Sequence, residues 1–400
     1  MAEAFIVDAL RSPTGKRNGA LAQVHGADLG AHVIKGIVER NAIPAAEYDD
    51  VIFGCVDTIG ALAGDIARTS WLAAGMPLNV PGTTIDRQCG SSQQAVHFAA
   101  QAVMSGTQDV VLAGGVQTMS RIPIGSAMLA GQPLGFSTPF AESQGWQARF
   151  GNAPVNQFYA AQRIADHWQI SREDMEVFAK ESHDRALRAM AEGRFQREIL
   201  PYGSFAMDET ARASTLEKLA TLQPVDPTYP KITAAVSSST CDAAAAILVV
   251  SEAALKKYNL TPRARIHHLS VLADDPIWHL TAPIPATAHA LKKAGMKIED
   301  IDFAGGFVIV PQTKNGQPRV APLSTEACKA ICRHLSGRAS GSLFEMTGNA
   351  IMLRLRSLGI ANAHAWRRGW AVESLRRGVS EASVKVAAGW SSGAMVSRYT

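Results

Sequence analysis

One cysteine of this 400-residue chain is placed where a thiol could act as a nucleophile. Cys89 follows a short run at residues 83–86 that predicts a strand, and it precedes an alanine-rich segment at residues 91–104 that predicts a helix. Unpaired N–H groups and the dipole at a helix start stabilise a nearby anion, so a thiolate is favoured there. Small residues beside the sulfur leave room for a substrate carbonyl. The alternative is a buried structural cysteine, because free cysteine is among the most buried residue types.

The elements that would position this cysteine follow a regular order. Short strands alternate with helices from residue 5 to residue 113, and an apolar run at residues 243–250 restores this rhythm. Such alternation predicts an α/β sheet covered by helices. Residues 119–237 are rich in Gly, Pro and polar residues and predict an inserted domain with one long helix. Ser171 and Asp174 are placed to cap the start of this helix, which runs towards Gly193.

Composition divides the chain near residue 302. Residues 303–400 hold 13 Lys and Arg against 4 Glu and no Asp, a net charge of +9, whereas the preceding residues hold 26 basic against 31 acidic residues, a net charge of −5. A basic excess favours a polyanionic partner such as DNA, although a solvated basic surface is the commoner explanation. Within this region Asn315-Gly316 predicts a hairpin between strands at 307–311 and 319–323, followed by helical segments.

The whole chain has the composition of a globular protein, with 47% hydrophobic residues and 18% charged residues. It lacks an uninterrupted run of about 18 apolar residues and an N-terminal secretory signal, which predicts a cytoplasmic protein with no membrane partner. Its five cysteines lack the C-x-x-C spacing of a zinc site. This spacing is typical of reduced thiols rather than of a disulfide framework.

The first three quarters of the chain resembles the thiolase family. The motif at 87–89, Arg-Gln-Cys, is similar to the setting of the family's nucleophile, and residues 11–16, Arg-Ser-Pro-Thr-Gly-Lys, resemble its opening motif. Residues 114–120, Gly-Gly-Val-Gln-Thr-Met-Ser, resemble its G-G-x-E-x-M-S, with Gln117 in place of the usual Glu. Residues 182–199 resemble its loop domain, and residues 281–287 resemble the start of its second half.

This resemblance implies acyl transfer through a thioester on Cys89, with acyl-CoA or 3-ketoacyl-CoA as substrate and partner. It implies a coenzyme A thioester as substrate and no permanently bound cofactor, and a homodimer formed through the thiolase-like domain. By position Ser238 matches the family's CoA-contacting serine, although Ala235 and Val236 replace the usual Gly-Asn; an ordinary polar turn is the alternative there. Metal ligands are not implied.

Three motifs that the family carries in its second half are missing from this sequence. After residue 302 there is no Asn-Glu-Ala-Phe, no Gly-His-Pro with the histidine that activates the nucleophile, and no Cys-x-Gly with the second acid/base cysteine. Loss of a coupled catalytic group commonly lowers a rate by orders of magnitude. We therefore expect impaired condensation and thiolysis, with slow acylation of Cys89 retained.

The last stretch of the chain resembles the catalytic end of the tyrosine recombinases. The order and spacing of His364, Arg367, Trp390 and Tyr399 are similar to those of that family, and Lys314 fits its hairpin lysine. The resemblance implies that the tyrosine attacks a DNA phosphodiester while Arg367, His364 and Trp390 bind the charged oxygens and Lys314 protonates the leaving oxygen. The family's first arginine and its DNA-clamping N-terminal domain have no counterpart here.

Together these features predict a fusion of two protein families. The expected fold is α/β, a thiolase-like layered fold with an inserted loop domain and a truncated second half, followed by a mainly α tail with a β-hairpin. Residues 1–118 and 238–268 form the expected N-terminal α/β domain, 119–237 the loop domain, 269–302 the start of the truncated second domain, and 303–400 the recombinase-like fragment. The alternatives to an acyltransferase are a DNA-binding recombinase remnant and a non-functional fusion product.

Overall fold

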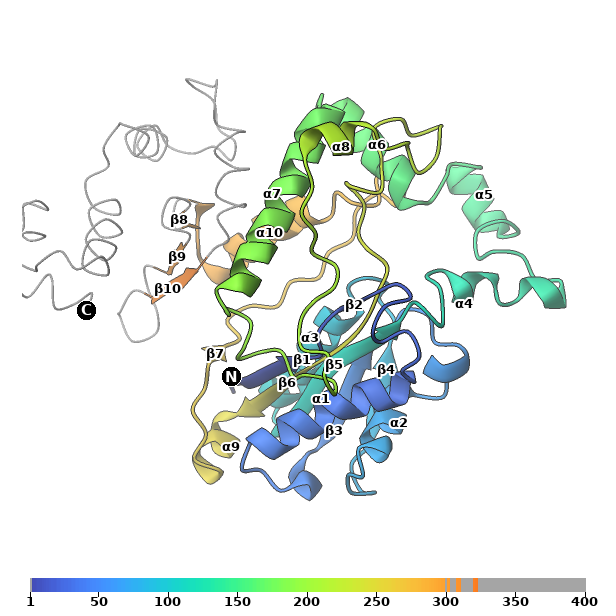
Figure 1. Cartoon of the computed structure of the whole chain (residues 1–400). Helices are drawn as coiled ribbons and strands as arrows, with labels where there is room; N and C mark the ends of the chain where they lie inside the picture. Colours follow the sequence, from blue (N-terminus) through green and yellow to red (C-terminus); the bar gives the residue numbers. More distant parts are fainter. Residues whose placement is uncertain (1, 299–300, 303–306, 311–318, 323–400) are drawn as a thin grey trace, which may run out of the picture. The chain divides into compact units, whose positions relative to one another are not determined.

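The computed structural model describes residues 2–298, 301–302, 307–310 and 319–322. The chain divides into two compact units, residues 1–283 and residues 284–400. The first unit carries a mixed sheet with the strand order β4-β3-β5-β6-β1-β7, and β2 pairs with β6 beside this path. Figure 1 shows the sheet at one end of this unit and the helices α5 to α8 at the other end.

The sheet combines parallel and antiparallel strands. The strands are β1 (Ala4–Arg11), β2 (Gly15–Lys16), β3 (Asp50–Gly54), β4 (Gly82–Ile85), β5 (Val110–Thr118), β6 (Cys241–Ser251) and β7 (Ala264–Arg265). β3 runs parallel to β4 and β5, whereas β5 and β1 both pair antiparallel with β6. The alternating pattern of the sequence therefore predicted the α/β sheet correctly.

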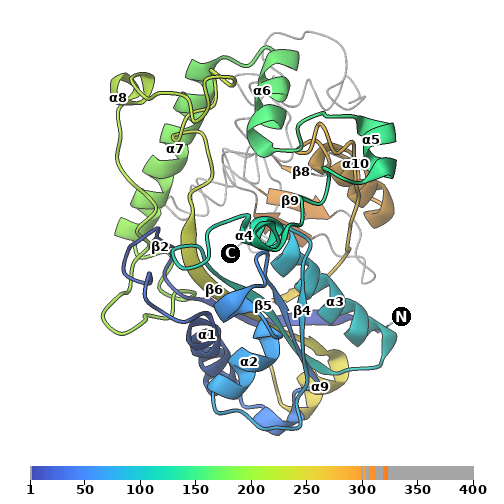
Figure 2. The same ribbon diagram turned by 90° about the vertical axis from the view of Figure 1, so that its right-hand side faces the viewer.

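Helices cover both faces of the sheet, which explains why its central strands are apolar on both sides. The helices α1 (Gly26–Arg40) and α2 (Ile66–Ala73) pack on one face, where Trp71 and Phe53 are fully buried. The helix α3 (Ser91–Ser105) packs on the other face through Ala95, Ala99 and Val103. Figure 2 shows the sheet between α1 and α2 on one side and α3 on the other. The start of α3 is thereby fixed against the sheet.

The segment between β5 and β6 folds as a set of helices. These are α4 (Ser126–Leu129), α5 (Gln144–Phe150), α6 (Gln157–His167), α7 (Arg172–Ala191) and α8 (Leu216–Ala220). The predicted capping box is confirmed, because Ser171 Oγ accepts from the Asp174 N–H at 3.0 Å and the Asp174 carboxylate accepts from the Ser171 N–H at 3.1 Å. One long helix was predicted here, so the other four were missed.

The remaining elements are 3-10 turns, two helices and the three strands of a second sheet in the described residues. A helix α9 (Glu252–Lys257) follows β6 directly, and three 3-10 turns cover Ala45–Glu47, Gly60–Leu62 and Gln132–Leu134. In the second unit, α10 (Pro283–Ala294) precedes the strands β8 (Ile301–Asp302), β9 (Phe307–Val310) and β10 (Arg319–Pro322). β9 and β10 pair antiparallel, as a hairpin requires. The mainly helical tail and the domain boundaries stay predictions.

Candidate active site

The cysteine at the start of α3 lies on a tightly bonded turn. Gln88 has a left-handed backbone with φ of 49°, a conformation that few residues other than glycine adopt. The Asp86 carboxylate stabilises it by accepting from the Gln88 N–H at 2.7 Å. Ser91 Oγ accepts from the Arg87 N–H at 2.8 Å and donates to the Gln88 carbonyl at 2.5 Å. The turn therefore holds the backbone of Cys89 in one orientation.

The thiol on this turn is open to solvent and belongs to the residue that precedes the N-cap of a helix. Cys89 is exposed, and Gly90 is the N-cap of α3, which carries no side-chain cap. A helix start without a side-chain cap leaves N–H groups and the positive end of the dipole to other partners. The placement of Cys89 between a strand and a helix start is as predicted. Its role as nucleophile remains a proposal.

Two glycines allow the helix start to approach the sheet closely. A Cβ atom on Gly54, at the end of β3, would collide with the backbone of Ser91 and Ser92. A Cβ atom on Gly115, in the middle of β5, would collide with Ser92 Oγ and with the Gly54 carbonyl. Because backbone atoms cannot move aside as a flexible side chain can, the position of α3 depends on both glycines. Through Gly115, the motif at 114–120 therefore helps to fix the position of the Cys89 turn.

A second helix contributes a polar group to the thiol. Gln157 is the first residue of α6, and its Nε2 lies 3.8 Å from Cys89 Sγ, within hydrogen-bond distance of sulfur. The two residues are 68 positions apart. Nothing in the local pattern around Gln157 indicated this contact, so the sequence did not predict it.

The other described cysteines have surroundings unlike that of Cys89. Cys55 is buried, and desolvation together with the nearby Asp57 carboxylate raises the pKa of its thiol to about 12. Cys241 is half-buried, and the pKa of its thiol is raised mainly by desolvation and to a smaller extent by the Asp242 charge. Both therefore stay protonated at neutral pH, because the thiolate is disfavoured by burial and by a like charge. Cys328 and Cys332 lie outside the described residues.

Gln117, the residue that departs from the thiolase motif, is built into the sheet behind the site. Its Oε1 accepts from the Val56 N–H at 3.2 Å and from Cys55 Sγ at 3.5 Å. Its Nε2 is buried without a hydrogen-bond partner in the described part of the chain. The amide oxygen therefore accepts two hydrogen bonds here, while the amide nitrogen stays unpaired. A glutamate side chain would offer acceptors only, and so would place an acceptor where this nitrogen lies.

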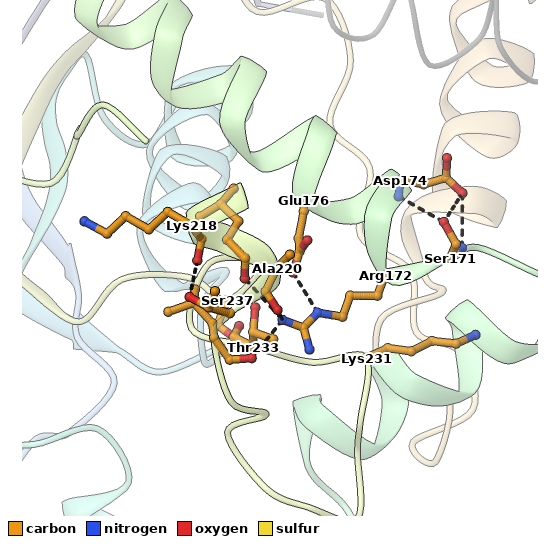
Figure 3. Close-up of polar contacts among 12 residues, drawn as sticks. Ser171, Arg172, Asp174, Glu176, Lys218, Ala220, Lys231, Thr233 and Ser237 are labelled. Atoms are coloured by element: carbon orange, nitrogen blue, oxygen red, sulfur yellow. Dashed lines mark hydrogen bonds and ion pairs between the residues drawn. The ribbon is translucent and has the colours of Figure 1, made fainter. Parts of the chain in front are cut away.

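The predicted CoA-contacting serine lies on a surface turn of the inserted segment. Ser238 is exposed, whereas the preceding Thr233 is buried. Ser237 Oγ donates to the Thr233 carbonyl at 2.8 Å, and the Val236 N–H donates to the same carbonyl at 3.2 Å. Figure 3 shows Ser237 and Thr233 in this turn beside α8. No hydrogen bond joins Ser238 to Cys89 in the described residues, and the CoA role of Ser238 stays a prediction.

The helices around this turn are joined by one arginine. Arg172, in the first turn of α7, donates to Glu176 Oε1 at 2.7 Å and to the carbonyls of Leu219, Ala220 and Leu222 at 3.2, 3.2 and 2.8 Å. The carbonyls of Leu219 and Ala220 belong to the end of α8, where the helix dipole favours a cation, and Leu222 follows this end by two residues. Figure 3 shows the guanidinium between α7 and this end of α8. Arg172 therefore has a structural role.

The opening motif at residues 11–16 joins the sheet to the inserted segment. Arg11, at the end of β1, donates to the Asp208 carboxylate at 2.7 and 2.9 Å and to Glu198 Oε1 at 2.8 Å. Asp208 also accepts from the Thr14 N–H at 2.7 Å. Burial would raise the pKa of Asp208, but the hydrogen bonds from Arg11 and Thr14 outweigh it and lower the pKa below its ordinary value.

We expect Asp208→Asn to lower the free energy of unfolding at pH 7 by about 1–2 kcal/mol, because it leaves Arg11 without its bidentate partner. A carboxylate with a lowered folded-state pKa stabilises the fold above its unfolded pKa of about 4, and this contribution is lost as pH falls further. Urea unfolding at pH 7 measures the decrease in the free energy of unfolding, and urea unfolding at about pH 3.5 measures how far this decrease shrinks at low pH. Glu173→Gln, on the exposed side of α7, makes the same charge change and should have little effect. A pH-independent difference between Asp208→Asn and the unaltered chain would contradict this account.

The recombinase-like residues cannot be placed in the structure. Lys314, His364, Arg367, Trp390 and Tyr399 all lie outside the described residues. In the described part, no three His, Cys, Asp or Glu side chains are grouped so that they could hold a metal ion. No helix in that part is both long and apolar enough to cross a membrane.

Comparison with known proteins shows that two parts of this chain match two different families. The model of the thiolase N-terminal domain matches residues 4–253, and the model of the phage integrase family matches residues 292–400. A steroid 3-ketoacyl-CoA thiolase of Mycobacterium tuberculosis is 53% identical over 306 residues, which cover 76% of this chain and 75% of the relative. A 3-ketoacyl-CoA thiolase of Escherichia coli is 38% identical over 314 residues, which cover 75% and 78%.

A solved structure agrees with the fold. The acetyl-CoA acetyltransferase of Bacillus anthracis is 32% identical and matches with a TM-score of 0.64 over 76% of this chain and 79% of that chain. The layered sheet and the inserted helices thus define an α/β protein with the thiolase fold. The chain belongs to the thiolase family. Its last quarter matches a second family, so both resemblances drawn from the motifs are confirmed.

Proposed function

We propose that the protein is a thiolase-type acyltransferase that takes an acyl group from acyl-CoA or 3-ketoacyl-CoA onto Cys89. The observation that carries this proposal is the exposed thiol on a rigid turn at the start of α3. With acyl-CoA, the thiolate attacks the thioester carbonyl, the Cys89 sulfur–carbon bond forms, the bond to the coenzyme A sulfur breaks, and coenzyme A leaves as a thiolate that takes a proton from solvent. With 3-ketoacyl-CoA, the thiolate attacks the 3-keto carbon, the C2–C3 bond breaks, and acetyl-CoA leaves as an enolate that takes a proton from solvent. Ser238 is the proposed contact for the coenzyme.

This function is supported by the relatives, which are named as thiolases that act on 3-ketoacyl-CoA. The chain has no counterpart of the histidine and the second cysteine that the thiolase motif places in the second half. We propose that acylation of Cys89 proceeds slowly and that condensation and thiolysis are strongly reduced, because a missing general base commonly lowers the rate by about 10²–10⁴. Coenzyme A release and thiolysis are measured separately to compare these steps.

Mass spectrometry of the intact protein and of its peptides tests the proposal directly. We expect incubation with acetyl-CoA or acetoacetyl-CoA to leave one acetyl group, on the peptide that contains Cys89. Circular dichroism of the same sample shows whether it is folded. A folded sample that gains no acyl group, or gains it on another residue, would refute the proposed half-reaction.

The same domain offers an edge for self-association. In the described part of the chain β4 pairs only with β3 and lies at the end of the strand order, so its other edge has no strand partner there. Such an edge readily pairs with a strand of a second copy. We propose a homodimer through the thiolase-like domain. Light scattering at several protein concentrations tests the proposed dimer, and a monomer throughout would refute it.

A second candidate function concerns the last quarter of the chain. Residues 292–400 match the phage integrase family, and residues 303–400 carry a net charge of +9. We propose that this part binds DNA through its phosphates. Binding by the full chain should weaken by at least about tenfold between 50 and 200 mM salt, because counterions are released on association. Tyr399→Phe should bind equally well, since phosphate contacts do not require the hydroxyl. Retention that does not depend on salt would contradict this candidate.

A further inference from the structure

The geometry points to Gln157 as the hydrogen-bond donor that holds the Cys89 sulfur and stabilises its thiolate. This inference rests on the proposed function, in which that sulfur is the nucleophile. The carrying observation is the 3.8 Å separation between Gln157 Nε2 and Cys89 Sγ. Both side chains are exposed, so the pair lies where a substrate could reach it.

The position of Gln157 is set by the helix that begins with it. Asn156 is the N-cap of α6, and its side chain accepts from the Tyr159 N–H at 2.7 Å. Ala160 and Ala165 on the same helix are buried. At the middle of the helix Gln162 Oε1 accepts from the Lys231 N–H at 3.1 Å. These contacts fix the backbone of Gln157, so its carboxamide stays close to Cys89.

The first residue of α6 therefore contacts, through its side chain, the sulfur that precedes the start of α3. Cys89 precedes α3, and Gln157 opens α6. Each helix start favours a negative charge within its first turn, so their effects on a thiolate have the same sign. The charged groups on the turn itself are Asp86 and Arg87, of which Asp86 is bound by the N–H and the side-chain amide of Gln88. A neutral donor from α6 adds stabilisation without adding a charge.

The chemistry of a carboxamide suits this role. Its N–H groups donate to a thiolate, and its oxygen accepts from a thiol, so one side chain can bond the sulfur in either protonation state. It cannot remove the proton, because an amide nitrogen is not a base at neutral pH. Gln157 thus replaces no general base; it holds the sulfur and donates to the thiolate that attacks.

The experiment compares Gln157→Glu and Gln157→Met with the unaltered full-length chain. Glutamate keeps the shape but removes the donor and adds a negative charge, and methionine keeps the length but cannot donate. We expect Cys89 to react with iodoacetamide about tenfold more slowly at pH 7 in Gln157→Glu, and about threefold more slowly in Gln157→Met. The midpoint of the pH–rate profile should move upward by about one pH unit in the glutamate variant.

Two controls separate this role from a general disturbance. Gln101→Glu makes the same charge change at an exposed position near the other end of α3 and should leave the profile unchanged. The alkylation rate of Cys241 in each variant reports whether the domain stays folded. Profiles of both Gln157 variants that superimpose on that of the unaltered chain would overturn the inference.

The alkylation measurement requires no acyl-CoA, so the two proposals can fail independently. A shifted profile in a chain that acetyl-CoA does not acylate would support the role of Gln157 and refute acyl transfer. An unshifted profile in a chain that is acylated on Cys89 would do the reverse. A shifted profile in a chain that is also acylated on Cys89 would place Gln157 in the acyl-transfer site.

Discussion

Cys89→Ala is expected to carry no acyl group after incubation with acetyl-CoA, while the unaltered chain carries one. Removal of the sulfur removes the nucleophile, and no other described cysteine can take its place. Burial raises the pKa of Cys55 to about 12, and desolvation with the Asp242 charge raises that of Cys241. We expect Cys89→Ser to be acylated at least about 100-fold more slowly, because an unactivated hydroxyl is a far weaker nucleophile than a thiolate.

Cys241→Ala is the matched control, since it removes a half-buried thiol from the same domain. Its acylation rate should equal that of the unaltered chain. Peptide mapping locates the label in each case. An adduct that persists in Cys89→Ala, or disappears in Cys241→Ala, would show that the reacting thiol was wrongly assigned.

Gly54→Ala is expected to displace Cys89, although Gly54 lies in β3 and not in the Cys89 turn. The new methyl group would collide with the backbone of Ser91 and Ser92, so α3 or β3 must shift. Overpacking of this kind lowers the free energy of unfolding by about 1–3 kcal/mol. Displacement of a reacting group by about 1 Å lowers a rate by about 100-fold. We therefore expect the acylation of Cys89 to be more sensitive than stability.

Gly145→Ala is the corresponding control, because a Cβ atom at that position in α5 meets nothing within 4 Å. It should leave acylation unchanged and should not lower the free energy of unfolding. Urea unfolding and the rate of label incorporation are measured on both variants. Equal rates for Gly54→Ala and the unaltered chain would mean that α3 adjusts without moving Cys89.

The sheet and the surroundings of Cys89 could be predicted because their signals are local. The runs that became β3 and β6 are apolar and bounded by polar or glycine residues, and α3 begins within two residues of the cysteine. The capping box at Ser171 was predicted for the same reason, since its two partners are three residues apart. Where the partners of a contact lie within one turn of chain, the sequence contains the whole signal.

The remaining features depend on contacts between distant residues. Gln157 approaches Cys89 across 68 positions, and no pattern in residues 156–160 distinguishes it from an ordinary surface glutamine. β5 was expected to end at residue 113, yet it continues through Gly114 and Gly115 to Thr118. Glycine weakens strand propensity, and here the neighbouring strands on both sides supply the pairing that local preference lacks. Tertiary structure overrode the local pattern.

The order of strands in the sheet has a consequence for the time at which the protein can fold. Among the described strands β1 pairs with β6 and β7, so the ladder that joins Ala4 to Ser251 cannot close until almost 250 further residues have been made. During synthesis at about 5–20 residues per second, the first strand therefore stays unpaired for roughly 12–50 s. Over that period its apolar residues are available to chaperones. A nascent chain arrested before β6 would leave both β1 and one edge of β5 without partners.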